Sequence, residues 1–191
     1  MKGKTILWIW VLLGVLFFTS PAAAASSSPA VGGVLPDISL PTPRDSAEKK
    51  YLGLSGSDHF KIPQIGATVV IIEIFSMYCP YCQAEAPSVN SLHARIENDP
   101  ALKGRIKLIG IGVGNSQFEV ELFKKKYAIP FPIFADGDFT NHAMVGEVRT
   151  PYFIAVKINR DGTHRVIYSK LGRMEGVDLF LASIIKLAGL K

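Results

Sequence analysis

The sequence contains two cysteines, Cys79 and Cys82, which are separated by only two residues, Pro80 and Tyr81. Two thiols at this spacing can be oxidised to a disulfide and reduced again, and a thiolate can attack a disulfide in another molecule. A disulfide that closes so short a loop contributes little stability, because the stabilisation grows with loop length. The spacing therefore favours reversible redox chemistry over a structural cross-link.

The residues around the cysteines predict different roles for the two thiols. Pro80 suits the first turn of a helix, where its missing N–H is not needed, so we predict a helix from Pro80 or Tyr81 to about Asn98. Unpaired N–H groups and the positive end of the helix dipole stabilise a thiolate at such a position. We therefore predict a lowered pKa for Cys79 and assign it as the attacking thiol. Cys82, about one turn into the helix, is assigned as the resolving thiol.

Two apolar, β-branched stretches predict the strands that position this site. The stretch 68–75 leads directly into the cysteines, and 106–113 is the second; both are expected to be buried strands in the centre of a sheet. Ser116 and Glu119 predict a capping box at the start of a helix that ends near Tyr127.

The remaining elements complete an α/β pattern. They are a short strand at 131–135, a weak helix at 138–145, strands at 152–158 and 163–169 joined by a turn at Asp161-Gly162, and an amphipathic helix from about Gly176 to Ala188. The order strand, helix, strand, helix, strand, strand, helix predicts a mixed central β-sheet with helices on both faces.

The N-terminal region differs in composition from the rest of the chain. Lys2 and Lys4 precede an apolar run that is followed by small residues, so we predict a secretory signal peptide at 1–25. An uncleaved N-terminal membrane anchor stays open as the alternative. Residues 26–33 are expected to be a flexible leader, and 34–191 the folded domain. The formal net charge of +5 is modest and does not indicate a nucleic-acid partner.

The start of the domain gives weaker patterns. The stretch from Val34 to Pro41 predicts an edge-type extended segment bounded by prolines. We expect Arg44 to Lys50 to form a polar loop and Tyr51 to Leu54 to form a short strand, and 55–66 has no regular pattern. No chemical role follows from this part of the sequence.

The cysteine stretch resembles a thioredoxin-fold active site, and residues 34–190 resemble the TlpA/ResA-like thiol-disulfide oxidoreductases, relatives of the redoxin and AhpC/TSA proteins. Tyr78 stands where these proteins usually carry a tryptophan, and Pro87 matches a proline that kinks the helix. Thr150-Pro151 resembles the cis-proline segment of the family. The Leu35 to Leu40 run is similar to the opening segment of such domains.

The resemblance implies roles for further residues. The Thr150–Pro151 bond is expected to be cis, with Pro151 against the cysteines and Thr150 offering backbone groups to a substrate. Tyr78, Pro80 and Tyr81 flank the cysteines and are assigned to substrate contact.

Glu73, six residues before Cys79, takes the place of a buried acid in thioredoxins. Burial would raise its pKa, and it could then accept the proton of Cys82. The alternative, that Glu73 simply faces solvent, stays open because side chains alternate along a strand.

The resemblance implies an extracytoplasmic, periplasmic-type protein-disulfide oxidoreductase that reduces its substrates, without a cofactor. Its partners would be cysteine-containing extracytoplasmic proteins and a membrane thiol-disulfide electron carrier, with cytochrome c maturation as one task. The Pro-Tyr dipeptide, typical of glutaredoxins, leaves the direction of electron flow open.

Several alternatives remain at this stage. A disulfide-donating oxidase or isomerase is the first, and a peroxiredoxin-like peroxidase using Cys79 is the second. A copper-binding module and a purely structural disulfide are the others. The four histidines, His59, His93, His142 and His164, are scattered, and we predict no metal site.

Overall fold

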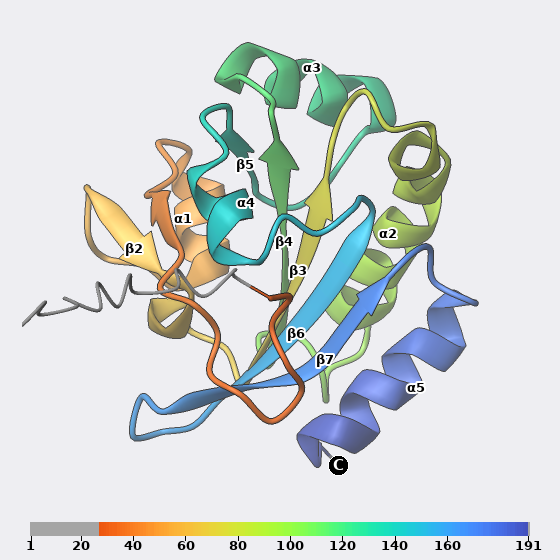
Figure 1. Ribbon diagram of the computed structural model, residues 1–191. Coiled ribbons are helices and arrows are strands. Elements are labelled where there is room, and N and C mark those ends of the chain that lie inside the picture. Colours follow the sequence, from red (N-terminus) through yellow and green to blue (C-terminus); the bar gives the residue numbers. More distant parts are fainter. Residues whose placement is uncertain (1–26, 191) are drawn as a thin grey trace, which may run out of the picture.

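The structure is a computed structural model that describes residues 27–190, and it is built on a five-stranded sheet (Figure 1). The strand order is β5-β4-β3-β6-β7. The strands are β3 (Val69–Phe75), β4 (Ile106–Val113), β5 (Ile133–Asp136), β6 (Tyr152–Ile158) and β7 (His164–Leu171). Strands β3, β4 and β5 are parallel, whereas β6 runs antiparallel to both β3 and β7. The predicted mixed sheet is confirmed.

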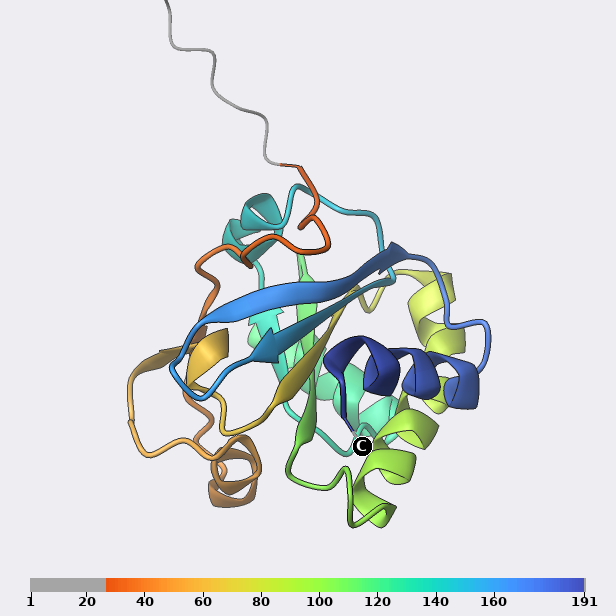
Figure 2. The ribbon, with the colours of Figure 1, turned by 90° about the horizontal axis from the view of Figure 1, so that it is seen from below.

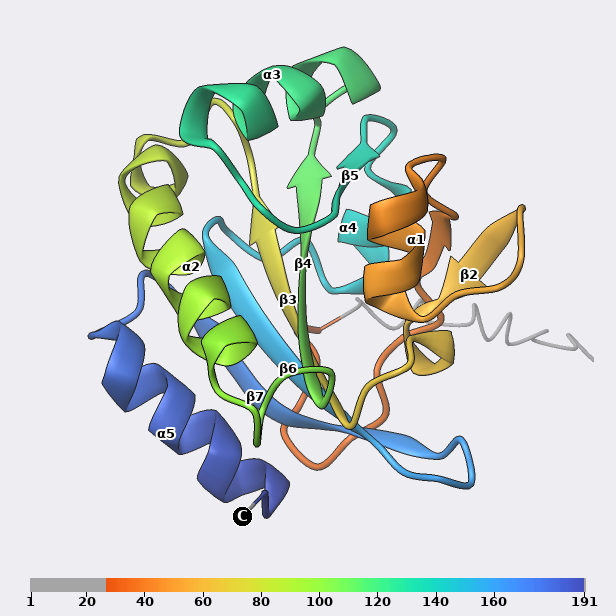
Figure 3. The same ribbon diagram turned by 180° about the vertical axis from the view of Figure 1, so that it is seen from behind.

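Helices and an N-terminal addition cover the two faces of this sheet. Helices α2 (Pro80–Asn98) and α5 (Val177–Ala188) lie side by side across one face, with α3 (Gln117–Tyr127) near them (Figure 3). The other face is covered by the chain from Leu35 to Ile65 and by the region around α4 (Thr140–Met144). The predicted α/β fold with three layers is therefore confirmed.

Strand β3 is buried along its whole length. Val69, Ile71 and Phe75 belong to the apolar cluster that includes α2 and α5. The alternate residues Val70, Ile72 and Ile74 belong to the cluster on the opposite face. The prediction of a central strand buried on both faces is confirmed, and its period of two also fixes which face Glu73 occupies.

Most predicted element boundaries agree with the structure to within two residues. Helix α2 begins at Pro80, and Ser116 and Glu119 form the predicted capping box at the start of α3. The Ser116 N–H donates to Glu119 Oε2 at 2.7 Å, and the Glu119 N–H donates to Ser116 Oγ at 3.4 Å. Within 138–145 the helix is shorter than expected, at five residues.

The predicted strand at Tyr51–Leu54 and the predicted loop at Arg44–Lys50 are both wrong. Helix α1 (Ser46–Leu52) occupies this stretch. Asp45 caps it by accepting a hydrogen bond from the Glu48 N–H at 2.8 Å, and Gly53 ends it with a φ of 67°. These two caps favour a helix over the strand that the apolar residues Tyr51 and Leu52 suggested. A cap satisfies backbone groups that a short helix otherwise leaves without hydrogen bonds.

The chain around α1 forms the predicted extended addition. Strands β1 (Ser39–Pro41) and β2 (His59–Lys61) pair antiparallel, and a single turn of 3₁₀ helix, η1 (Ile62–Gln64), follows. Leu40 and Phe60 face inward from the two strands and join the sheet's apolar cluster.

The segment 27–33, predicted to be a flexible leader, is attached to β7. The Gly32 N–H donates to the Val166 carbonyl at 2.8 Å, and the Val166 N–H donates to the Gly33 carbonyl at 2.8 Å. Figure 2 shows this segment, in orange, running alongside β7. The predicted signal peptide at 1–25 lies outside the described residues. Across residues 27–190, no helix combines the length and apolar character that a membrane span needs.

Two glycines in β4 make room for an aromatic ring beneath the helices. A methyl group placed on Gly110 would come within 2.7 Å of Ile133 Cγ2 and 3.1 Å of Phe75 Cε1. A methyl group on Gly112 would also lie 3.1 Å from the Phe75 ring. The ring of Phe75, in the last residue of β3, therefore occupies the space that these residues leave free.

We predict that Gly110→Ala lowers the free energy of unfolding by about 1–3 kcal/mol, because a closely packed core accommodates an added methyl group only by strain. Gly56→Ala is the matched control, since nothing lies within 4 Å of a methyl group there, and it should change stability by less than about 0.5 kcal/mol. Urea denaturation of both variants measures the difference. Equal stability of the two variants would contradict the predicted crowding.

Candidate functional site

The two cysteines lie at the junction where the chain leaves β3 and begins α2. Cys79 is the N-cap residue of α2, with extended backbone (φ −82°, ψ 114°), and its side chain is partly exposed. Cys82 lies in the first turn and is fully buried. Both are free thiols in this structure. The sequence therefore correctly predicted one accessible and one enclosed sulfur.

The first turn of α2 stabilises the ionised form of Cys79. Partial burial raises the pKa of this thiol, but several hydrogen bonds outweigh that effect. They come from the Thr150 side chain, from the backbone and thiol of Cys82, and from the Tyr81 backbone. The net result is a pKa of Cys79 below its ordinary value, as predicted from the position at a helix N-terminus.

Burial has the opposite effect on Cys82. It raises the pKa of this thiol strongly, a backbone hydrogen bond at Ser76 lowers it in part, and the neighbouring Cys79 and Glu73 raise it further. A thiol in this environment stays protonated at neutral pH unless a neighbouring group takes its proton.

Glu73 is 5% exposed and lies on the same face of β3 as α2. Burial raises its pKa to about 8, and the negative charges of Glu85 and Cys79 raise it as well. The alternative that Glu73 faces solvent is therefore excluded.

Glu85 is a second buried carboxyl group near the cysteines that the sequence did not reveal. It lies on α2, one turn beyond Cys82, and is fully buried. Arg173 Nε donates to Glu85 Oε2 at 2.5 Å, and the Met174 N–H donates to Oε1 at 3.0 Å. Its spacing of three from Cys82 on a helix was the available clue, because such residues share a face.

The Thr150–Pro151 peptide bond is cis, as the family resemblance implies. The Cys79 thiol donates a weak hydrogen bond to the Thr150 carbonyl oxygen at 3.4 Å, and Pro151 is buried beside it. Two chain segments separated by 70 residues thus meet at the accessible sulfur.

The other predicted contact residues surround the same sulfur. Tyr78 and Tyr81 are 65% and 67% exposed, and Pro80, between the cysteines, is exposed at the first position of α2. The Tyr78 hydroxyl donates to Glu119 on α3. All eight residues assigned from the sequence therefore lie at one end of the sheet.

Two polar side chains that the sequence did not single out hold the loop before Cys79. Asn115 is fully buried, and its Oδ1 accepts the Met77 N–H at 2.8 Å. Gln83 Nε2 donates to the Met77 carbonyl at 2.8 Å. Both backbone groups of Met77 are thus bonded to side chains, which fixes the approach to Cys79. Asn115 follows β4, whose carboxyl end adjoins that of β3, and this adjacency was the available clue.

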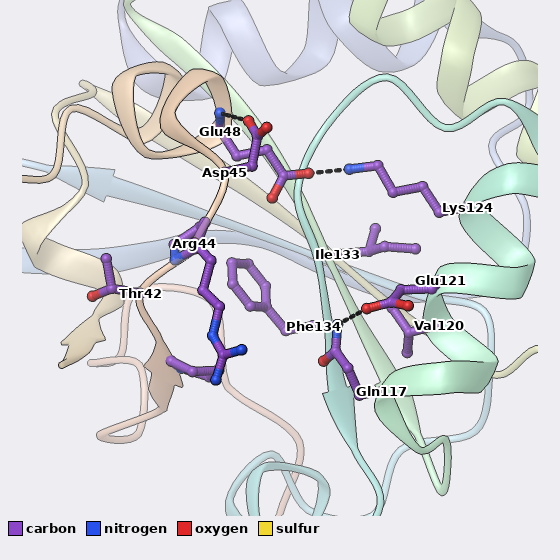
Figure 4. A pocket seen from close by; sticks show the side chains of 12 residues that line it. Thr42, Arg44, Asp45, Glu48, Gln117, Val120, Glu121, Lys124, Ile133 and Phe134 are labelled. Atoms are coloured by element: carbon purple, nitrogen blue, oxygen red, sulfur yellow. Dashed lines mark hydrogen bonds and ion pairs between the residues drawn. The ribbon is translucent and has the colours of Figure 1, made fainter. Parts of the chain in front are cut away.

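Two hollows near these elements differ in chemistry. One, of about 610 Å³, is lined by Tyr78, Tyr81 and Thr150 among others, and the carbonyl oxygen of Thr150 lies 3.4 Å from the Cys79 sulfur. The second, of about 550 Å³, lies between α1 and α3 and contains neither cysteine (Figure 4). Two of its charged lining residues, Lys124 and Glu48, form an ion pair. Only the first hollow adjoins a reactive group of this site.

Within residues 27–190, no group of three or more His, Cys, Asp or Glu side chains is arranged to hold a metal ion. The negative charge of Glu73 raises the pKa of Cys82, and that of Glu85 raises the pKa of Glu73.

The chain is similar to proteins of known family. Residues 31–163 match the AhpC/TSA family. Over 170 residues the chain is 24% identical to the thiol-disulfide oxidoreductase ResA of Geobacillus kaustophilus, covering 88% of this chain and 83% of that protein.

Solved structures with the same fold include two proteins connected with DsbE by name. A putative thiol:disulfide interchange protein DsbE from Chlorobium tepidum matches with a TM-score of 0.63 at 16% identity, over 85% of this chain and 100% of that one. A secreted Mycobacterium tuberculosis disulfide oxidoreductase matches with a TM-score of 0.55 at 19% identity, over 78% and 96%. At these identities the likeness shows the shared fold.

We predict that Cys79 reacts with iodoacetamide at lower pH than free cysteine, whose pKa is about 8.5. Its lowered pKa keeps a larger thiolate fraction at neutral pH, and that fraction falls only as the pH drops below the lowered value. The Cys82→Ser variant isolates Cys79 and keeps a hydroxyl donor beside it. Alkylation rates between pH 5 and pH 10 give the midpoint.

The Cys79→Ser variant is the matched comparison, because it leaves Cys82 as the only thiol. Burial and a raised pKa should make Cys82 react at least about tenfold more slowly at pH 7. Equal rates for the two variants, or a midpoint for Cys79 above that of free cysteine, would contradict the assigned roles.

Proposed function

Because the chain belongs to the AhpC/TSA family, and because an accessible and a buried thiol meet at the start of α2, we propose that it catalyses thiol–disulfide exchange with other proteins. The observation that carries this proposal is the contrast between the two sulfurs. Cys79 is partly exposed with a lowered pKa, whereas Cys82 is buried beside it with a raised pKa. An attacking and a resolving thiol need these opposite properties.

The proposed reduction of a substrate disulfide takes two steps. The Cys79 thiolate attacks one substrate sulfur, the substrate S–S bond breaks, and the other substrate sulfur leaves as a thiolate. Cys82, once deprotonated, attacks the Cys79 sulfur of the mixed disulfide and releases the second substrate thiolate. Two electrons have then passed to the substrate, each substrate thiolate takes up a proton, and the protein holds a Cys79–Cys82 disulfide.

We assign Glu73 as the group that takes the proton of Cys82 in the second step. Cys82 ionises poorly by itself because it is buried. The Glu73 carboxyl group, with a pKa of about 8, is ionised in part of the molecules at neutral pH and titrates close to the pH at which it would act. A solvent-exposed glutamate, with a pKa near 4.3, would be a much weaker base.

The substrate contacts in this proposal are those around Cys79. Thr150 would offer backbone groups to the substrate chain next to the buried Pro151, and its carbonyl oxygen already lies 3.4 Å from the Cys79 sulfur. Tyr78, Pro80 and Tyr81 are exposed around the same atom. They would contact the residues on either side of the substrate cysteine.

We place the protein on the reducing side of this exchange and outside the cytoplasm. Strong oxidants have a stabilised reduced form; here the stabilised Cys79 thiolate acts in that direction, whereas the buried Glu73 and Cys82 oppose it by disfavouring further negative charge. The basic and apolar pattern of residues 2–25 supports export. A membrane thiol-disulfide carrier would then supply electrons, and cysteine pairs awaiting haem in c-type cytochromes are the substrates suggested by the TlpA/ResA-like resemblance.

The proposal is tested by mixing the reduced protein with glutathione disulfide and with a protein disulfide, and by trapping free thiols over time. We predict reduction of both substrates and loss of activity in Cys79→Ser. Cys82→Ser should accumulate the mixed disulfide. Absence of any exchange, or consumption of hydrogen peroxide alone, would overturn the proposal.

The same thiol trapping in glutathione buffers gives the equilibrium potential of the cysteine pair. A value near the roughly −270 mV of thioredoxin would support a reductant. A value near the roughly −120 mV of a strong oxidant would reverse the proposed direction of electron flow.

We predict that Glu73→Gln slows the second step of exchange about tenfold or more, because general-base contributions commonly reach 10²–10⁴. Reaction with 5,5′-dithiobis(2-nitrobenzoate) separates the steps, since each releases one coloured thiolate. The first release, from attack by Cys79, should change less. Glu121→Gln on the exposed face of α3 is the control. Equal slowing of both releases would contradict the assignment of Glu73 to Cys82.

A further inference from the structure

Exposed aromatic side chains gather around the 610 Å³ groove beside Cys79. Tyr78 and Tyr81, which flank Cys79 in the chain, line it together with Phe139, which is 51% exposed. The buried residues Val113 and Val148 also line it. Single exposed apolar residues are common, but a group around one hollow indicates a contact site.

The backbone of Phe139 is unusual in a way that points to the same groove. Its φ of 62° lies in the left-handed region, where a bulky residue is uncommon and asparagine or glycine is favoured. The ring lies over Gly114, where a methyl group would come within 2.8 Å of Phe139 Cζ. The left-handed backbone of Phe139 and the missing side chain of Gly114 together place an aromatic ring that remains half exposed. Strained residues of this kind cluster at active sites, ligand clamps and switch regions.

The charged groups at the rim do not select a charged ligand. Glu147 and Arg149 both line the groove and are exposed, and they carry opposite signs. His142 Nε2 lies 2.9 Å from the Val148 carbonyl, within hydrogen-bonding distance. Because these contributions offset one another, discrimination between substrates would depend on the apolar surface.

The position of the reacting sulfur determines which substrate residue can reach this surface. An extended chain rises about 3.3 Å per residue, and its side chains alternate between two faces. If the substrate cysteine points at Cys79, the residues two positions away point toward the protein as well. They lie about 7 Å along the chain, and the groove begins at Tyr78, Tyr81 and Thr150, which all adjoin Cys79.

We propose that the groove between Tyr78, Tyr81 and Phe139 binds an aromatic or large aliphatic side chain two residues away from the reacting cysteine of an extended substrate segment. This inference rests on the proposed function, because the substrate must be held at Cys79. It names the substrate class as unfolded or extended polypeptide with an apolar residue at that spacing. Phe139 is then a specificity-determining residue.

The test uses short peptides whose single cysteine carries a 2-nitro-5-thiobenzoate group. Attack by Cys79 on the peptide sulfur releases the coloured thiolate. The peptides place phenylalanine two residues before or two residues after the cysteine, with serine at the same position as the matched peptide. A further set places phenylalanine directly beside the cysteine. Second-order rate constants at low peptide concentration are compared for the reduced protein.

We expect phenylalanine at one of the two-residue positions to raise the rate constant by at least about tenfold over serine, a typical gain for one buried apolar side chain. Phenylalanine next to the cysteine should give less than half of that gain. In Phe139→Asn, which suits the left-handed backbone, the preference should fall to about twofold or less. Leu179→Asn, at a 71% exposed site on α5, should keep it.

The outcomes separate this inference from the proposed function. No reaction with any peptide would defeat both. Equal rates with phenylalanine and serine in the unaltered protein would overturn the groove assignment and leave the exchange reaction standing. A preference that survives Phe139→Asn would also overturn it, provided that circular dichroism shows the variant folded.

Discussion

Strand β3 is buried on both faces, so its residues must keep one register in the sheet. That register fixes Phe75, the last residue of β3, and thereby the point from which the chain reaches both cysteines. Phe75 is locked against Gly110 and Gly112, so the chain leaves the sheet at Ser76 and turns into α2. Asn115 and Gln83 then hold Met77 from two sides. A one-residue shift in β3 would turn Glu73 toward the opposite face. The chemistry of the site thus depends on the register of a single strand.

The same burial makes the site a place where negative charge is costly. Glu73 and Glu85 are both buried, and Glu85 forms an ion pair with Arg173. The pairing of Glu85 keeps a charge near Glu73, which helps to hold the Glu73 pKa near 8. Around Cys79, by contrast, hydrogen bonds from Thr150 and from Tyr81 and Cys82 in the first turn favour a thiolate. Two sulfurs one helical turn apart therefore have opposite acid–base behaviour.

Sequence patterns predicted the parts of the structure that repeat with a strand or helix period, or that local capping determines. The burial of β3, the start of α2 at Pro80 and the capping box at Ser116 all follow from such rules. Helix α1 was missed because its two caps, Asp45 and Gly53, decide the conformation of a stretch with mixed polarity. Asn115, Glu85 and Phe139 were missed because their importance comes from contacts with distant segments. The cis bond at Pro151 came from family resemblance, since local sequence rarely predicts it.

The attachment of residues 32 and 33 to β7 has a consequence for solubility. Strand β7 lies at the end of the sheet, and an uncovered edge strand is a template on which other extended chains can assemble. Gly32 and Gly33 occupy both backbone groups of Val166, so the middle of this edge is already paired. The short N-terminal segment therefore blocks the middle of β7 as a place where another extended chain could add to the sheet.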